Sequence, residues 1–259
     1  MNHRSQESIV RVAGITCLTI VALLGAPQTR ADDKIDAIAR EAIAKWNAVK
    51  SLKAKMTVKS EVARMGQVMR TDVTGSFELL RKGGKALYRQ EHNATSMLDA
   101  NGRQMTIKAR ILTVYDGEYL YQHQVAEQLG QNMATKRKMD TGGMLAGGEQ
   151  MFEILRNNFD LTAGADTKVN GDDCWVIDAR PKMPNPQPGA PTVLTHYIRK
   201  KDGFEIKLVG VNADGKTVLE TTYSDIHLNE PIDPSRFKFV PPEGVTVMDM
   251  TSSPMPDAP

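Results

Sequence analysis

The chain is poor in cysteine, with only Cys17 and Cys174 among its 259 residues. Cys17 lies in an N-terminal segment that we expect to be removed, so only Cys174 remains and no intramolecular disulfide can form. A hydrophobic core rather than covalent cross-links therefore has to stabilise the fold. A chain of this length can bury such a core. Because Cys174 stands beside Trp175 in a strand-like segment, we expect it to be a buried apolar side chain rather than a nucleophile.

A surplus of charge of one sign is missing as well. The sequence holds 33 Lys and Arg against 31 Asp and Glu. Proteins that bind nucleic acid carry a basic surplus on one face, so the balance argues against nucleic acid as a partner. A short basic run, TKRK at 135–138, could contact anionic headgroups or an acidic partner, but a solvated loop is the preferred interpretation.

Sequence motifs of catalytic and metal sites are also lacking. There is no HExxH, GxSxG, SxxK or P-loop pattern, and the acidic residues are scattered. The histidines do not stand at metal-ligand spacing. We therefore predict no catalytic residues, no metal and no cofactor, and keep an enzyme with a dispersed active site as an alternative. The histidines beyond the N-terminal segment are His92, His123, His196 and His227.

The N-terminus has the pattern of an export signal. Two arginines precede the apolar run 12–26, and a small residue suited to cleavage, Ala31, follows. The run is shorter than the ~20 residues of a membrane-spanning helix. We predict a signal peptide over 1–31, a periplasmic mature chain that does not span the membrane, and no lipidation of Cys17, which lies in mid-run.

Two segments have a helical period. They cover 32–52 and 149–159. Acidic residues at the start of the first segment suit a helix N-terminus. The apolar stripe of the first helix is Ile35, Ile38, Ala42, Trp46 and Val49. The stripe of the second is Met151, Phe152, Leu155 and Phe159.

Most other segments alternate between apolar and polar residues, as antiparallel strands with one wet face do. The polar stretch 127–148 between them predicts a mobile loop, 184–189 an exposed Pro-rich connection and 252–259 a disordered tail. We predict one domain over 32–251 with an α+β, mainly β fold. It is an incomplete, half-open antiparallel barrel of roughly ten strands covered by the N-terminal helix and one or two short middle helices.

The stretch FKFVPPEGVTV, 237–247, ends the strand series. Two prolines interrupt its alternation, and proline cannot donate a ladder hydrogen bond. We expect it to be the closing edge strand of the barrel. Asp233 and Pro234 before it predict a short helical turn.

Methionine is abundant, with 14 residues. It suits irregular cores and also surfaces that accommodate variable apolar ligands. The interior of a half-open barrel is either packed or hollow, and a hollow one binds apolar molecules. Core packing is the alternative role for every candidate lining residue. The candidates are Ile38, Trp46, Val49, Met56, Val58, Phe77, Leu79, Leu87, Met105, Ile107, Leu112, Val114, Leu120, Met151, Phe152 and Leu155.

Four segments, in order, resemble the outer-membrane lipoprotein carrier (LolA-like) superfamily. They are VKSLKAKMTV at 49–58, VYDGEYLYQ at 114–122, VNGDDCWVIDARPK at 169–182, and the C-terminal stretch 212–247 with its F-x-F-x-x-P-x-G-V ending. The resemblance implies a half-barrel whose apolar cavity shields acyl chains. It also implies an inner-membrane donor and an outer-membrane acceptor protein as partners. The longer middle segment and the Pro-rich 184–189 depart from the family pattern.

The sequence thus predicts a monomeric periplasmic carrier or binding protein for lipoproteins or other acyl-chain lipids. The alternative is a sensor of envelope stress or of mislocalised lipoproteins, which would use the same fold to regulate a protein partner.

Overall fold

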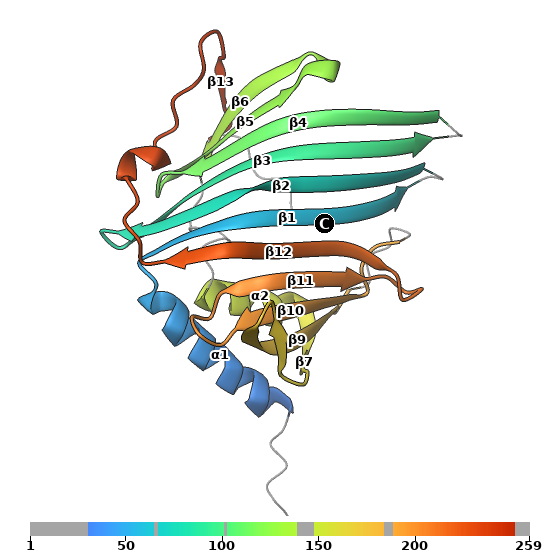
Figure 1. Ribbon diagram of the computed structural model, residues 1–259, viewed down its shortest axis with the longest axis vertical. Coiled ribbons are helices and arrows are strands. Elements are labelled where there is room, and N and C mark those ends of the chain that lie inside the picture. Colours follow the sequence, from blue (N-terminus) through green and yellow to red (C-terminus); the bar gives the residue numbers. More distant parts are fainter. Residues whose placement is uncertain (1–30, 65–66, 101–102, 139–147, 184–188, 252–259) are drawn as a thin grey trace, which may run out of the picture.

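A computed structural model describes residues 31–64, 67–100, 103–138, 148–183 and 189–251. Residues 1–30 of the predicted signal peptide (1–31), the GGMLAG stretch (142–147), most of the Pro-rich connection and the tail 252–259 lie outside the described residues. The protein is built on one open sheet (Figure 1). Its strand order is β13-β6-β5-β4-β3-β2-β1-β12-β11-β10-β9-β7, with β8 paired to β9.

Over the described residues, thirteen strands and two α-helices make up the fold, with two short 3-10 turns. The helices and turns are α1 Ala31–Ala48, α2 Glu149–Asn158, η1 Glu127–Leu129 and η3 Pro234–Phe237. The first six strands are β1 Ser51–Arg64, β2 Gln67–Lys82, β3 Lys85–Ala100, β4 Arg103–Tyr115, β5 Tyr119–Ala126 and β6 Gln131–Lys138. The others are β7 Phe159–Ala163, β8 Thr167–Val169, β9 Asp172–Pro181, β10 Val193–Arg199, β11 Glu205–Val211, β12 Thr217–Leu228 and β13 Val247–Asp249.

The four longest neighbouring strands, β1 to β4, pair antiparallel without a register shift. In Figure 1 they lie side by side, and their far ends extend away from α1. Directly opposite residues of paired strands share a face of the sheet. The register therefore assigns each side chain of these strands to one of two faces.

One face, which we call the helix-side face, carries the core. Trp46 at the end of α1 stacks on Phe204 with 5.2 Å between ring centroids. It also packs in a buried cluster with Phe77 and Leu79. A second cluster joins α1 and Phe152 of α2 to β9 and β10. Both helices thus cover β9 and β10, and the end of α1 covers β11 and the near ends of β1 to β4.

The opposite face, which we call the outer face, is crossed at its near end by the C-terminal segment. Phe237 is 1% exposed, and Phe239 stacks on Tyr121 at 5.2 Å. Arg236 Nε donates to Glu78 Oε2 at 2.7 Å. The segment then continues to β13, which pairs parallel with β6 at the sheet edge.

The predicted architecture is confirmed, with two corrections in detail. Residues 131–138 form β6 rather than a mobile loop, so the basic run 135–138 lies in a strand. Only Ala134 of β6 is buried, so the strand needs no alternation of apolar and polar residues. Without that alternation, the sequence pattern does not reveal the strand. In 237–247 the prolines lie in irregular chain, and the edge strand follows them as β13.

Candidate functional site

Beyond the core under α1, the helix-side face of β1 to β4 continues as four cross-strand rows. Counting outward from the core, these are the Met56, Val58, Ser60 and Val62 rows, each with one residue per strand. The Met56 row is Met56, Gly75, His92 and Ile111. The next are Val58, Val73, Ala94, Ala109 and then Ser60, Thr71, Ser96, Ile107. The last is Val62, Met69, Leu98 and Met105.

We call the Val58, Ser60 and Val62 rows, which lie farthest from the core on the helix-side face, the open apolar face. None of their side chains is charged, and the hydroxyls of Thr71 and Ser96 hydrogen-bond each other at 3.0 Å. With ~4.8 Å between strands and ~3.4 Å per residue, the face measures about 14 Å in each direction. An uncharged surface of this kind is a candidate binding surface for an apolar ligand.

The rim of the open apolar face is its most exposed part. Val62 is 40% exposed, Met69 41% and Met105 47%. These three side chains lie in one row with the half-buried Leu98. Flexible, polarisable methionine side chains at a rim can adjust to apolar ligands of different shape.

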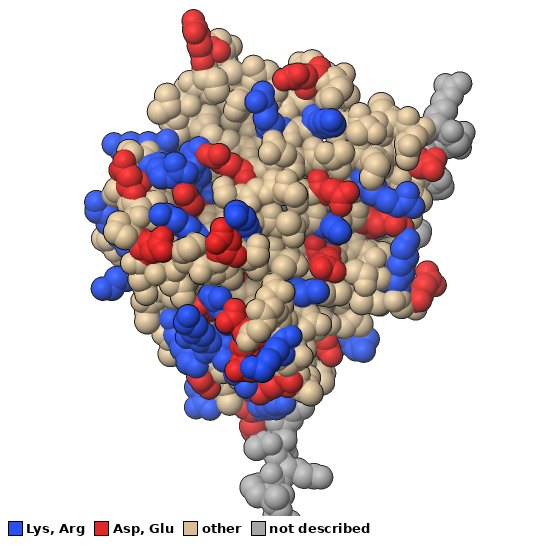
Figure 2. Space-filling view, viewed as in Figure 1, with Lys and Arg blue, Asp and Glu red and all other residues tan. Residues whose placement is uncertain are grey.

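The outer face of the same strands is charged. Glu61 accepts from Arg70 at 3.1 Å and pairs with Lys216 at 2.5 Å, while Lys55 pairs with Asp225 at 2.9 Å. The surface shown in Figure 2 likewise has basic and acidic side chains interspersed. The two faces of β1 to β4 therefore suit partners of different chemistry.

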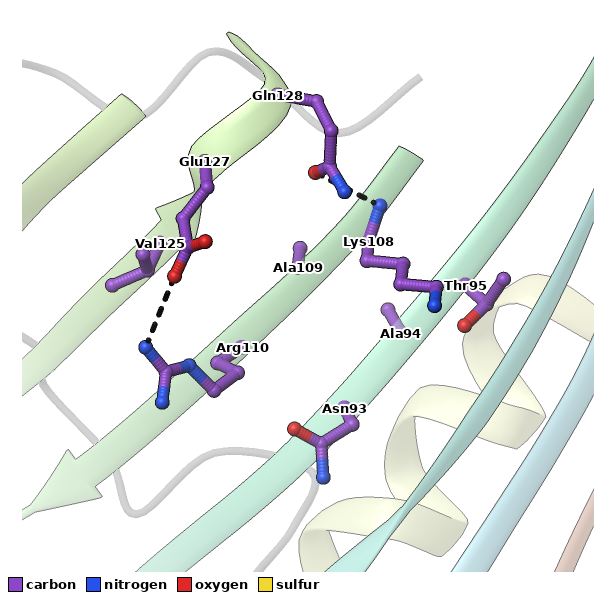
Figure 3. A pocket seen from close by; sticks show the side chains of 9 residues that line it. All are labelled: Asn93, Ala94, Thr95, Lys108, Ala109, Arg110, Val125, Glu127 and Gln128. Carbon is purple, nitrogen blue, oxygen red and sulfur yellow. Dashed lines mark hydrogen bonds and ion pairs between the residues drawn. The ribbon is translucent and has the colours of Figure 1, made fainter. Parts of the chain in front are cut away.

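The outer face has a shallow polar pocket of about 400 Å³, drawn in Figure 3. Arg110 Nη2 lies 3.6 Å from the Glu127 carboxylate, and the Lys108 N–H donates to Gln128 Oε1 at 3.4 Å. Charged side chains of Lys108, Arg110 and Glu127 line it, and Arg110 pairs with Glu127, so the pocket does not suit an acyl chain. Among the described residues, no group of His, Cys, Asp and Glu could hold a metal ion.

The predicted lining residues fall into three places. The largest group is buried in the core with the helices, or lies at its border. On the helix-side rows are Met56, Val58, Met105 and Ile107. In the core or beside it are Ile38, Trp46, Val49, Phe77, Leu79, Leu120, Met151, Phe152 and Leu155.

Three predicted lining residues, Leu87, Leu112 and Val114, lie on the outer face. Leu87 is opposite Leu80, and Leu112 and Val114 are opposite residues of β3 that share the outer face. The register corrects the prediction for these three, because side chains alternate along a strand and apolar content alone does not fix their phase. Sequence reasoning also missed most of the rim. The two-residue link between Arg64 and Gln67 would have fixed the phase, because a short hairpin sets the register.

Few polar groups reach the helix-side face. His92 is half-buried, its Nδ1 has no hydrogen-bond partner in the described structure, and desolvation lowers its pKa. The buried His196 on β10 pairs with the half-buried Glu205 on β11. Burial, followed by the charge of Glu205, raises the pKa of Tyr223. Tyr88 shows the same effect of burial, which together with Tyr115 raises its pKa to about 12.

No protein-family model matches the chain, and no curated protein matches its sequence. Solved structures do match. An uncharacterized conserved protein from Thermus thermophilus is 12% identical, with 83% of this chain and 99% of that one covered and a TM-score of 0.45. A chain of the Pseudomonas aeruginosa MucA/MucB complex is 12% identical over 80% of this chain and 61% of its own length, with a TM-score of 0.43.

A third match is a LolA superfamily protein from Nitrosomonas europaea, 11% identical over 79% of this chain and 97% of that one, with a TM-score of 0.27. At these identities the similarity concerns the fold alone, so no ligand or partner is carried over. Neither described helix is long and apolar enough to cross a membrane.

Proposed function

We propose that this chain is a periplasmic carrier or binding protein for lipoproteins or other acyl-chain lipids, and that it acts without catalysis. The observation that carries the proposal is the open apolar face, which is uncharged, extends over four strands and has a methionine-containing rim. Each methylene group removed from water contributes ~0.8 kcal/mol. A face about 14 Å across, with the strand spacing of a sheet, can take several methylenes of each chain.

The remaining predictions complete this proposal. We infer a signal peptide over 1–31, a single domain over 32–251 and a disordered tail over 252–259. The proposed partners are acyl chains of lipids or lipoproteins, an inner-membrane donor and an outer-membrane acceptor. A sensor that regulates a protein partner through the same face is the alternative function.

The test places a charge on the open apolar face. Ala94 lies in the Val58 row and also borders the pocket of Figure 3, and its chain neighbour Thr95 belongs to the opposite, outer face by strand alternation. We expect Ala94→Asp to weaken binding of a fluorescent acyl-chain lipid at least ten-fold, because burying a carboxylate against the chain is costly. Thr95→Asp is the matched control and leaves binding unchanged. Thermal melts check that both variants fold.

Equal binding by wild type and Ala94→Asp would contradict the proposal, as would the absence of lipid binding in the wild type. Transfer of lipid between vesicles separates the two functions. A chain that binds lipid, does not transfer it and captures a membrane protein is a sensor rather than a carrier.

A further inference from the structure

The buried His196 and its half-buried partner Glu205 lie on the same face as the proposed lipid site. His196 is opposite Ile177, a fully buried residue of the core beneath the helices. On its other side it is opposite Leu208, which is opposite Thr221, and Thr221 is opposite Val58. The register therefore joins His196 to the Val58 row of the open apolar face, about 14 Å away at ~4.8 Å per strand.

A β-bulge turns Glu205 onto this face. Tyr197 is opposite Lys207 but Ile198 is opposite Glu205, so Ile206 is an extra residue in β11. Bulges re-aim side chains, and here both Ile206 and Glu205 reach the helix-side face, one in the core and the other on His196. Regular alternation would have placed Glu205 beside Lys207, whose ion pair with Glu220 at 3.4 Å lies on the outer face.

The contact between His196 and Glu205 determines whether the second ring nitrogen of His196, Nε2, donates or accepts a hydrogen bond. His196 Nδ1 meets a Glu205 carboxylate oxygen, and an ionised carboxylate only accepts, so Nδ1 carries the proton. In the neutral ring Nε2 is then an acceptor. This atom is buried and has no hydrogen-bond partner in the described structure, and the whole residue is 6% exposed.

Buried polar atoms of folded proteins almost always have a partner, so a buried acceptor without one calls for an explanation. His123 and His227 on the outer face differ in this respect. His123 bonds Asn132 at 2.8 Å, and His227 bonds Asp225 and Glu230 at 3.0 Å. The unpartnered acceptor is on the face proposed to receive an amphiphile.

We propose that His196 Nε2 is the polar anchor of the lipid site, held by Glu205. This proposal rests on the proposed function. The ligand is an amphiphile with a neutral O–H or amide N–H donor next to its acyl chain. The group donates to Nε2 while the chain extends along the Val58 row. An anionic carboxylate head is disfavoured, because it has no proton to donate and meets the negative charge of Glu205.

The experiment compares four ligands that share a 12-carbon acyl chain. They are 1-lauroylglycerol with O–H donors, N-methyllauramide with an N–H donor, methyl laurate with neither, and the laurate anion. Each displaces the apolar fluorophore N-phenyl-1-naphthylamine from the full chain. We expect at least one donor ligand to bind about five-fold more tightly than methyl laurate, as one additional hydrogen bond allows, and the better donor ligand identifies the head group.

Three variants test the residues. His196→Phe keeps an apolar ring and is expected to bind the donor ligands and methyl laurate equally, with methyl laurate unchanged. Glu205→Gln can donate or accept toward Nδ1, so it no longer fixes the tautomer, and the preference is expected to shrink. His123→Phe is the outer-face control and keeps the full preference.

The outcomes separate the two proposals. If all four ligands bind wild type equally, or if His196→Phe retains the preference, the anchor is overturned while lipid binding stands. If neither the fluorophore nor any ligand binds wild type, the proposed function itself fails.

Discussion

At the residue scale, two histidines show how the faces differ chemically. Desolvation on the helix-side face lowers the pKa of His92, whereas hydrogen bonds from His227 to Asp225 and then Glu230 raise the pKa of His227 on the surface. An unfolded histidine titrates at about 6.5. Opposite shifts from this value make opposite contributions to the pH dependence of stability.

Whether each histidine stabilises the protein at high or at low pH depends on whether its folded or its unfolded state binds a proton more readily. Below about 6.5 the unfolded chain protonates His92 before the folded protein does, so its contribution is present above that pH and lost as pH falls. The contribution of His227 is fully present below about 6.5 and lost as pH rises through its raised folded pKa. We expect the free energy of unfolding of His92→Gln, measured in urea between pH 5 and 8, to rise relative to that of wild type as the pH falls.

His227→Gln is expected to show the opposite change. Its free energy of unfolding should fall relative to that of wild type as the pH falls. Profiles of the two variants that run parallel to that of wild type would show that neither shift is present in the folded protein.

At the element scale, the packing of α1 on the turn between β10 and β11 holds the helix-covered end together. Gly203 in this turn has φ +73°, and a Cβ there would lie 2.1 Å from the Ala42 carbonyl oxygen of α1. Next to it, the buried side chains of Arg199 and Asp202 pair, and Asp202 Oδ1 accepts from the Phe204 N–H at 3.0 Å. The turn is therefore fixed by backbone conformation, by close approach and by charge.

Gly203→Ala should destabilise the protein by about 2–4 kcal/mol, because a left-handed backbone strain adds to a backbone clash. The matched control is Gly215→Ala in the turn between β11 and β12. Gly215 has φ +77°, and a Cβ added there would meet no atom within 4 Å in the described structure, so this variant has the strain without the clash. Chemical denaturation measures both, and equal losses would show that α1 does not approach the turn as described.

At the scale of the whole molecule, the open half-barrel and its two helices could be predicted from the sequence. The apolar stripe of α1 and the alternation in β1 to β4 depend on local spacing alone. The faces could not be assigned as well, because the phase of each strand depends on hairpin register. Leu87, Leu112 and Val114, predicted to line the cavity, lie on the outer face instead, and the prediction omits Met69 from the rim.

The pairing of elements distant in sequence was also beyond prediction. β13 joins β6 across more than a hundred residues, and neither has a strong apolar pattern. The Glu205 bulge has no local sequence signal, since a regular strand would place the same residue outside. Such features follow from tertiary packing rather than from propensity.

The measurement that tests the central claim most directly is photolabelling of the chain by a lauroyl lipid with a diazirine in its acyl chain, mapped by peptide mass spectrometry. Labels are expected to concentrate on the helix-side face, in the row that leads from His196 across Leu208 and Thr221 to Val58, and Ala94→Asp is expected to reduce them. Labels spread equally over outer-face residues of the same strands, such as Lys59 and Asp72, would contradict it.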